Sequence, residues 1–224
     1  MTCLLPVWLL SCSMAQAQGN HPVENASESG ASALPPVTVR SLLEIRRQNV
    51  VIQKWDLSCG AAALTTLLRY QHGEPVTEKL VAASLMRRPE YIEHPELIQV
   101  REGFSLLDLK RDVTARGYKG VGYGKMAFED ALAKAPLLVP IDVNGYNHFV
   151  VFRGASNGNV LLADPAWGNR TMPIDAYIAS WINYPGFGRV GFAVRRPDGS
   201  APPLPALMPR PEDFPFVRRA GAGS

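Results

Sequence analysis

The chain has 224 residues, 46% of them hydrophobic, which predicts a single domain able to bury a core of its own. The net charge is +3, and the 23 lysines and arginines are spread along the chain rather than gathered in a stripe with aromatic residues. No apolar run reaches the ~18 residues of a membrane-spanning helix. We therefore expect neither nucleic-acid binding nor a transmembrane span.

The first 17 residues predict a secretory signal peptide. They are rich in apolar residues, and Ala15-Gln16-Ala17 fits a small-x-small cleavage site, although no Lys or Arg precedes the apolar stretch. Two alternatives stay open here: a disordered N-terminus, and a lipoprotein signal that would anchor the chain at Cys12. Residues 18–38 are polar and rich in Pro and Ser, which predicts a flexible leader. Export through such a signal predicts a periplasmic protein.

The cysteines become informative once a signal peptide is expected. Cleavage after Ala17 would remove Cys3 and Cys12 and leave Cys59 as the one cysteine of the mature chain. An unpaired thiol is a liability in an oxidising compartment, so its retention there favours a chemical role. The alternative is a buried structural cysteine, which is the commoner fate of a lone Cys.

The segment around this cysteine predicts a helix, after a short element within residues 39–52. From Gly60 onward, three alanines and three leucines form an apolar face at helical spacing, and Gly73 is placed to end the helix in a left-handed turn. Ser58 is a candidate N-cap, which would put Cys59 in the first turn. There the positive end of the helix dipole favours a thiolate over a thiol.

The rest of the chain changes from helical to strand periodicity after residue 117. Helices are expected at 77–88, 105–117, 127–135 and 173–181, and strands at 118–123, 137–143, 148–154, 160–164 and 189–195. Helices followed by a largely antiparallel sheet predict an α+β domain over residues 39–196. Residues 197–224, rich in Pro, Ala and Arg, predict a disordered tail.

A long irregular connection is expected between the predicted helices 77–88 and 105–117, at residues 87–104. Long connections in compact domains are often binding loops. The apolar residues Tyr91, Ile92, Leu97 and Ile98 within it have two open explanations. They contact a substrate segment upstream of the cleaved bond, or they fill a small satellite core.

A thiol nucleophile needs a base, and a histidine is the first candidate. Of the four histidines, His21 lies in the leader, His72 beside a helix end and His94 in the irregular connection. His148 opens a strand and is the candidate base. A histidine beside an apolar strand is more often a structural residue, so His148 needs a partner to carry the argument.

Asp164, at the end of the next expected strand, is the candidate partner. If the two strands form a hairpin centred on Ser156, Asp164 lies directly opposite His148, and the Cβ atoms are ~5 Å apart. A two-residue turn at 157–158 would instead place Asp164 opposite Val151. We expect the first register, through a longer or bulged turn. The simpler alternative is that this aspartate only forms a turn before the following proline.

Gln53 lies six residues before Cys59. Its side-chain amide could donate, together with the Cys59 main-chain N–H, to the oxyanion of a tetrahedral intermediate. By composition alone it is a surface glutamine.

Together these residues resemble the bacteriocin-processing (double-glycine leader) cysteine peptidase family. The similarity rests on Gln53, Asp56 through Ala62, Gly103 through Leu109, Asn147 through Val150, Ala163 through Pro165, and Trp181, and it spans roughly residues 47–195. It implies a papain-like α+β fold, in which the nucleophile begins a helix packed on an antiparallel sheet. It also implies the catalytic set Cys59, His148, Asp164 and Gln53. No cofactor and no metal are expected.

Two departures from the family pattern matter. Many members carry Asp immediately before the cysteine, where this chain has Ser58. Well-known members are domains of peptide-exporting ATP-binding transporters, whereas this chain has no G-x-x-x-x-G-K-[ST] phosphate loop. The chain is similar instead to stand-alone exported members, including those of functional-amyloid secretion systems.

The resemblance implies an exported cysteine peptidase that cleaves after small residues, at a Gly-Gly-like site in a secreted or amyloid-type substrate. Its implied partners are a peptide or protein substrate, such as an amyloid subunit, and components of a secretion system. Two alternatives stay open. One is a non-catalytic, peptidase-like module that binds export substrates, and the other is a thioester-forming acyl or amide transferase.

Overall fold

A computed structural model describes residues 40–210 and 212 of the chain. The predicted signal peptide and leader lie outside the described residues, as do residues 213–224. The elements in chain order are α1 (Leu42–Arg47), α2 (Cys59–Tyr70), α3 (Glu78–Met86), α4 (Pro89–Glu93), α5 (Leu97–Val100), α6 (Leu106–Ala115), β1 (Lys119–Tyr123), α7 (Phe128–Lys134), β2 (Leu137–Val143), β3 (Tyr146–Ser156), β4 (Asn159–Asp164), β5 (Gly168–Pro173), α8 (Ile174–Ser180), β6 (Asn183–Tyr184), β7 (Gly188–Arg189) and β8 (Gly191–Arg195).

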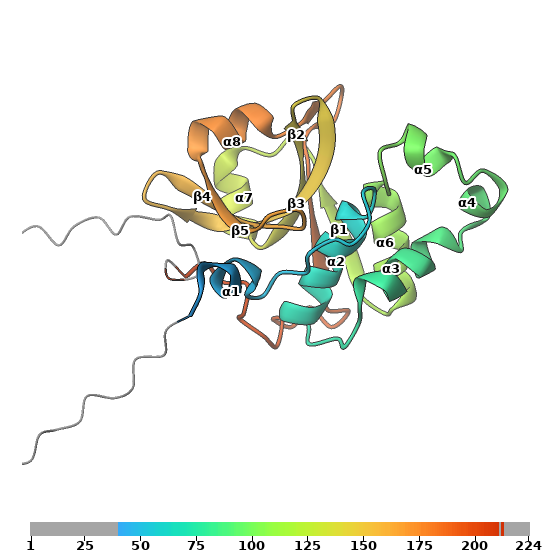
Figure 1. Cartoon of the computed structure of the whole chain (residues 1–224), viewed down its shortest axis with the longest axis horizontal. Coiled ribbons are helices and arrows are strands. Elements are labelled where there is room, and N and C mark those ends of the chain that lie inside the picture. Colours follow the sequence, from blue (N-terminus) through green and yellow to red (C-terminus); the bar gives the residue numbers. More distant parts are fainter. Residues whose placement is uncertain (1–39, 211, 213–224) are drawn as a thin grey trace, which may run out of the picture. The chain divides into compact units, whose positions relative to one another are not determined.

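Six of the strands form an antiparallel sheet in the order β1-β8-β2-β3-β4-β5 (Figure 1). Strands β6 and β7 pair separately as a short hairpin. Side chains alternate between the two faces of the sheet. Leu138 and Val151 join a core with α2, α3 and α6, while Val139 and Val150 join a second core with α7 and α8. Helices on the two faces of an antiparallel sheet confirm the predicted α+β class.

Helix α2 is the most buried helix of the described chain, with ten buried residues among its 12. Gly73 follows it with a φ of +74°, a conformation that glycine adopts without a steric cost, as the sequence predicts. The predicted caps of the next long helices are also present. The Thr77 hydroxyl accepts from the Leu80 N–H at 3.3 Å, and Ser105 forms a capping box with Asp108 at the start of α6.

The connection between α3 and α6 is less irregular than predicted, because it contains the short helices α4 and α5. Tyr91 of α4 is 1% exposed, and its hydroxyl donates to the buried Asp108 carboxylate, so this residue belongs to the core. Ile92 is 67% exposed. Strand β5 is absent from the sequence-based prediction, yet it pairs with β4 along its whole length.

The prediction of a disordered tail is wrong for residues 204–209, because these residues pack on the domain. Leu207 is 1% exposed, and the Leu204 N–H donates to the Gln71 carbonyl at 3.2 Å. The fully buried Arg153 of β3 donates to the main-chain carbonyls of residues 206, 207 and 208. A proline-rich segment makes few hydrogen bonds of its own, and here a distant arginine satisfies its carbonyls. The domain therefore extends beyond residue 196.

Between residues 40 and 210, no helix is both long and apolar enough to cross a membrane.

Candidate active site

The candidate nucleophile, Cys59, is the first residue of α2 and is 1% exposed. Ser58 occupies the N-cap position, as predicted, but its hydroxyl makes no capping bond to the helix. The hydroxyl lies instead 2.7 Å from the carbonyl oxygen of Trp55 and 2.6 Å from Oε1 of Glu78. The main-chain N–H groups of the first turn, which have no acceptor within the helix, therefore surround Cys59 without a side-chain cap.

The candidate base and its partner are hydrogen-bonded. Nε2 of His148 lies 2.8 Å from Oδ1 of Asp164, and both side chains are buried. The Cys59 side chain lies close enough to the His148 ring to raise the pKa of His148. Because Nε2 contacts the carboxylate, Nδ1 is the ring nitrogen left for the thiol. The structure thus hydrogen-bonds His148 to Asp164 and places Cys59 close to the same ring.

The register that produces this pair differs from the expected one. Asn157 and Gly158 form a two-residue turn, which the sequence analysis had weighed as the unfavourable alternative. A bulge at Arg153 then shifts the register by one, and continuing it from Val151↔Ala163 puts Asp164 beside Val150. His148 lies two positions along on the same face, within reach across the diagonal. Without the bulge, the carboxylate and the imidazole would point to opposite faces.

The electrostatics of the pair favour the imidazolium form of His148. Burial lowers the pKa of His148, but hydrogen bonds and charges from Asp164 and Cys59 outweigh it and raise that pKa from 6.5 to about 9. Burial also raises the pKa of Asp164, and the His148 hydrogen bond and charge, followed by the charge of Arg170, bring it below its usual value. The ring is therefore held protonated beside an ionised carboxylate near neutral pH.

Arg170 of β5 is a site residue that the sequence analysis missed along with its strand. Its Nε donates to Oδ2 of Asp164 at 2.7 Å, and the Ala166 N–H donates to Oδ1 at 2.8 Å. The carboxylate is thus held from three sides by His148, Arg170 and the turn that follows β4. The Asp-Pro-Ala-Trp-Gly sequence of residues 164–168 could have indicated Arg170, because it predicts a turn. A strand that folds back after this turn brings Arg170 close to the Asp164 carboxylate.

Gln53 lies on the segment that leads into α2, and its main-chain N–H donates to the Pro165 carbonyl at 2.9 Å. This bond places the glutamine beside the turn that carries Asp164. Its side-chain nitrogen donates to the carbonyls of Trp55 and Asp56 at 3.1 and 3.3 Å, while Oε1 is buried with no partner among the described residues. The structure thus places Gln53 near the site with its amide turned into its own loop.

Two other contacts couple the helical half of the site to the sheet. A Cβ on Gly60 would lie 3.2 Å from the ring of Phe149, so the glycine lets the residue after His148 pack directly on α2. The Tyr146 hydroxyl donates to the Asp56 carbonyl at 3.2 Å. Burial, and then the nearby charge of Cys59, raise the pKa of Tyr146, so this tyrosine is a second site residue that sequence reasoning missed.

The remaining described histidines have other partners. His72 contacts the Val194 carbonyl through Nε2 at 3.2 Å, and His94 pairs with Glu96 on the surface. His21 lies outside the described residues. Among residues 40–210, no group of three His, Cys, Asp or Glu side chains could hold a metal ion.

Comparison with known proteins identifies the family of the chain. The sequence model of the Peptidase C39 family matches residues 47–185, which is more than half of the chain. The chain belongs to the Peptidase C39 family.

Two curated relatives carry the name "Probable functional amyloid protease FapD". The one from Pseudomonas aeruginosa is 35% identical over 143 residues, which cover 64% of this C39 chain and 61% of the relative. The one from Pseudomonas fluorescens is 35% identical over 162 residues, which cover 70% and 69%. The match with the first relative thus spans less than two thirds of that protein.

Two solved structures are similar in fold to this C39 chain. A double glycine motif protease from an AMS/PCAT transporter aligns with a TM-score of 0.50 and 22% identity, over 66% of this chain and 94% of that one. The peptidase domain of Streptococcus ComA aligns with a TM-score of 0.50 and 14% identity, over 66% and 97%. These neighbours confirm the papain-like fold that the resemblance implied.

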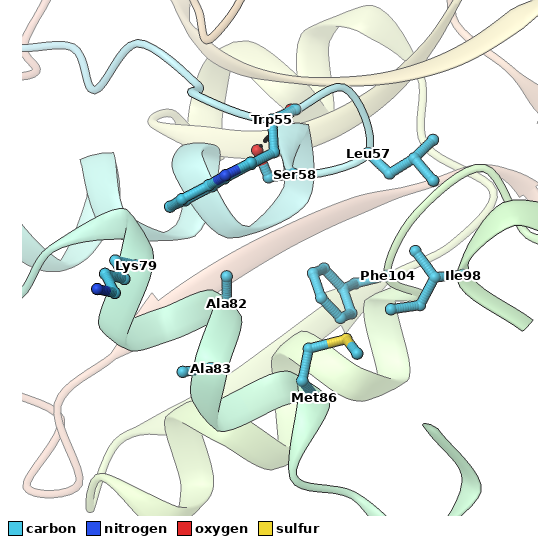
Figure 2. Close-up of a pocket in the computed structure, with 9 residues that line it drawn as sticks. All are labelled: Trp55, Leu57, Ser58, Lys79, Ala82, Ala83, Met86, Ile98 and Phe104. Atoms are coloured by element: carbon cyan, nitrogen blue, oxygen red, sulfur yellow. Dashed lines mark hydrogen bonds between the residues drawn. The ribbon is translucent and has the colours of Figure 1, made fainter. Parts of the chain in front are cut away.

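Two cavities flank the C39 site. The first, of about 330 Å³, is almost wholly apolar, and Figure 2 shows Trp55 and Leu57 on one side of it and α3 with Met86 on another. Ile98 and Phe104, at the end of the long connection, complete its wall. The second cavity, of about 590 Å³, is lined by His148, by residues 101–107 and by the β6–β7 hairpin. The connection 87–104 therefore contributes both to the core, through Tyr91, and to the cavity that Ser58 lines.

Proposed function

We propose that this chain is an exported cysteine peptidase that cleaves peptide bonds after small residues, at a Gly-Gly-like site in a secreted or amyloid-type substrate. Cys59 is the nucleophile, His148 the general acid and base, and Asp164 the residue that orients the imidazole. Gln53 and the Cys59 N–H hold the oxyanion. The observation that carries the proposal is the buried hydrogen bond between His148 and Asp164, with Cys59 close enough to the ring to raise the pKa of His148.

The reaction follows from the charges of this chain. The Cys59 sulfur attacks the scissile carbonyl carbon, and the carbonyl π electrons move onto oxygen. When that intermediate collapses, the C–N bond breaks and the His148 imidazolium gives its proton to the leaving amine. A water then attacks the thioester, His148 takes its proton, and the acid product and the thiolate are released. Asp164 remains ionised throughout and fixes which ring nitrogen faces the sulfur.

The oxyanion would be met by two donors. One is the N–H of Cys59, at the first position of α2, where no intrahelical acceptor exists. The other is the Gln53 amide nitrogen, which must turn one N–H away from the carbonyls of Trp55 and Asp56 when substrate binds. Donors of this kind are each worth ~10²–10³ in turnover in other peptidases.

A preference for small residues is supported by the burial of the reacting groups. Cys59 is 1% exposed and His148 is 6% exposed, so an approaching peptide reaches the sulfur only if it is slim on both sides of the scissile carbonyl. Glycine and alanine meet that condition. The name of the double glycine motif protease, solved in complex with the leader peptide, describes such a site in a similar fold.

The apolar cavity lined by Ser58, the residue before Cys59, would bind a substrate segment upstream of the cut. Its lining by Trp55, Leu57, Met86, Ile98 and Phe104 suits aliphatic or aromatic side chains. Binding energy gained there can be used to orient the scissile bond, so truncated substrates should lose turnover as well as affinity.

Export is part of the same proposal. The first 17 residues would direct the chain to the periplasm, with a lipid anchor at Cys12 as the alternative route. The relatives' name places them with functional amyloid, which supports an amyloid subunit or a secretion-system component as substrate or partner.

The test compares the wild-type chain with Cys59→Ala and His148→Ala on a peptide bearing a Gly-Gly bond and on the same peptide with Val-Val. We expect the wild type to cleave only the first peptide, and both variants to be inactive. Equal cleavage by wild type and Cys59→Ala would sink the proposal. Binding without cleavage would support a binding module, and transfer of the acyl group to an added amine, read by product mass, would support a transferase.

A further inference from the structure

A buried carboxylate that the proposed mechanism does not use lies behind the nucleophile. Glu78, the first residue of α3, is 4% exposed. Its Oε1 lies 2.6 Å from the Ser58 hydroxyl and accepts from the main-chain N–H of Lys54 at 3.0 Å. Its Oε2 is buried with no hydrogen-bond partner among the described residues. Burying a carboxylate costs free energy unless hydrogen bonds or an opposite charge compensate for the water that it loses.

The two groups that meet Oε1 stand at the two ends of one loop. Lys54 directly follows Gln53, and Ser58 directly precedes Cys59. The loop 54–58 therefore connects the two proposed oxyanion donors, which are the residues on either side of it. A single oxygen atom of Glu78 contacts both ends of this loop. Ser58 also lies 2.7 Å from the Trp55 carbonyl within the same loop, a contact drawn as a dashed line in Figure 2.

The direction of the loop carbonyls depends on this arrangement. The carbonyls of Trp55 and Asp56 are the present acceptors of the Gln53 amide, and the Trp55 carbonyl is also a neighbour of the Ser58 hydroxyl. If Glu78 no longer held Ser58 and the Lys54 N–H, the loop would be free to change the aim of the Gln53 amide and of the Cys59 N–H. A shift of about 1 Å in such donors is enough to lose much of a transition-state interaction.

We propose that Glu78 is a positioning residue for the oxyanion site, and that its buried carboxylate fixes loop 54–58 so that Gln53 and the Cys59 N–H converge on the substrate carbonyl oxygen. The inference rests on the proposed peptidase function. Glu78 touches neither substrate nor sulfur and acts through Lys54 and Ser58.

The test separates the oxyanion site from the nucleophile with two reagents. Iodoacetamide alkylates the Cys59 sulfur by displacing iodide, so its rate reports the thiolate and His148 without forming an oxyanion. A peptide aldehyde ending in glycinal adds to the sulfur and turns its carbonyl oxygen into the negatively charged or protonated oxygen of a hemithioacetal. Alkylation is followed at the Cys59 peptide by mass spectrometry, since the full chain also contains Cys3 and Cys12.

The variants are Glu78→Ala and Glu78→Gln in the full chain. For Glu78→Ala we expect kcat on the Gly-Gly peptide and affinity for the aldehyde each to fall ~10- to 100-fold, with KM and the alkylation rate within ~2-fold of wild type. Glu78→Gln keeps an acceptor oxygen for both contacts and should recover most of the loss. The matched control is Asp112→Asn, which also alters a buried carboxylate with one unpartnered oxygen, on α6, and should leave all four values unchanged.

If Glu78→Ala does not fold, Ser58→Ala removes one of the two contacts at lower cost and should show the same split with a smaller factor. A folded Glu78→Ala that keeps wild-type aldehyde affinity overturns the inference, as does an equal loss of alkylation and aldehyde binding. Failure of the proposed function itself looks different, because the wild type would then cleave nothing and bind no aldehyde.

Discussion

Replacing Asp164 by Asn tests whether this carboxylate controls the charge of His148. The amide keeps the size of the carboxylate and an oxygen that can accept from Nε2, but it removes the negative charge. In the wild type, the bonds and charges of Asp164 and Cys59 raise the pKa of His148 to about 9 in spite of its burial. In Asp164→Asn burial is still present and one of these two partners is weakened, so the pKa of His148 should fall towards or below 6.5.

The effect can be expressed as stability. The pKa of His148 is higher in the folded state than in the unfolded state. The contribution of His148 protonation to the free energy of unfolding is therefore fully present below pH 6.5 and is lost as the pH rises through about 9. The gap between 6.5 and about 9 corresponds to about 3 kcal/mol of unfolding free energy. The wild type should lose about that amount from this group between pH 6 and 9.5, and Asp164→Asn should lose much less.

Urea unfolding of the full chain at pH 6, 7.5 and 9.5 measures this difference. The variant also loses the pairing with Arg170, which shifts its stability at every pH, so the slope rather than the absolute value is diagnostic. Burial lowers the pKa of His72 in both proteins, and that contribution, which has the opposite sign, cancels in the comparison. The control is Asp198→Asn, an exposed carboxyl with a pKa of about 2, which should keep the wild-type slope. Parallel slopes for wild type and Asp164→Asn would refute the reasoning.

Three further substitutions test the fold around the site. Gly168→Ala should lower stability by about 2 kcal/mol or more, because the new Cβ would clash with the Arg46 carbonyl oxygen. Gly145→Ala, with a similar φ but open space around it, isolates this clash in melting temperature. Leu207→Ala should cost about 2–4 kcal/mol in urea unfolding, and an unchanged midpoint would return residue 207 to a disordered tail. Tyr91→Phe removes a buried hydroxyl donor and should cost about 1–2 kcal/mol while activity per folded molecule stays constant; a selective loss of activity would make the tyrosine a binding residue.

The sequence predicts the α+β class and the nucleophile's place at the start of α2 because these follow from local patterns. The apolar face of α2, its Gly73 ending and the Ser105 capping box each need only a few neighbouring residues. Ser58 shows the limit of such reasoning. Its N-cap position is local and predictable, but its hydroxyl contacts Glu78, 20 residues away in sequence.

The pairing of His148 with Asp164 is a correct prediction reached through a wrong register. The Asn157-Gly158 turn is the one that local rules favour for a hairpin, and taken alone it separates the two side chains. The bulge at Arg153 restores the pair. Nothing in the strand sequence marks that bulge, because the groups that hold Arg153 lie in residues 206–208 and at Asn169.

Strand β5 and the tail escaped the sequence analysis for the same reason. The strand Gly168–Pro173 is polar and short, and its stability comes from pairing with β4 and from Asn169, whose amide donates to the carbonyls of Ile45 and Gln48. The tail has a composition typical of disorder, but Leu207 finds a place in the core. In both cases the stabilising contacts are made with a partner strand or with a segment more than 100 residues away in the sequence. No local window of the sequence contains both partners of such a contact.

These distant contacts tie together the separate segments that form the candidate site. Arg153 sets the register of β4 and is itself held by the carbonyls of residues 206–208, so the packing of the C-terminal segment bears on where Asp164 points. The Pro165 carbonyl, one residue further on, accepts from Gln53 and so fixes the start of the loop that Glu78 holds behind Cys59. A change at the C-terminal segment can therefore be transmitted towards Cys59 through hydrogen bonds that include the side chains of Arg153 and Glu78. For this reason residues 204–209 belong to the same packed unit as the candidate site.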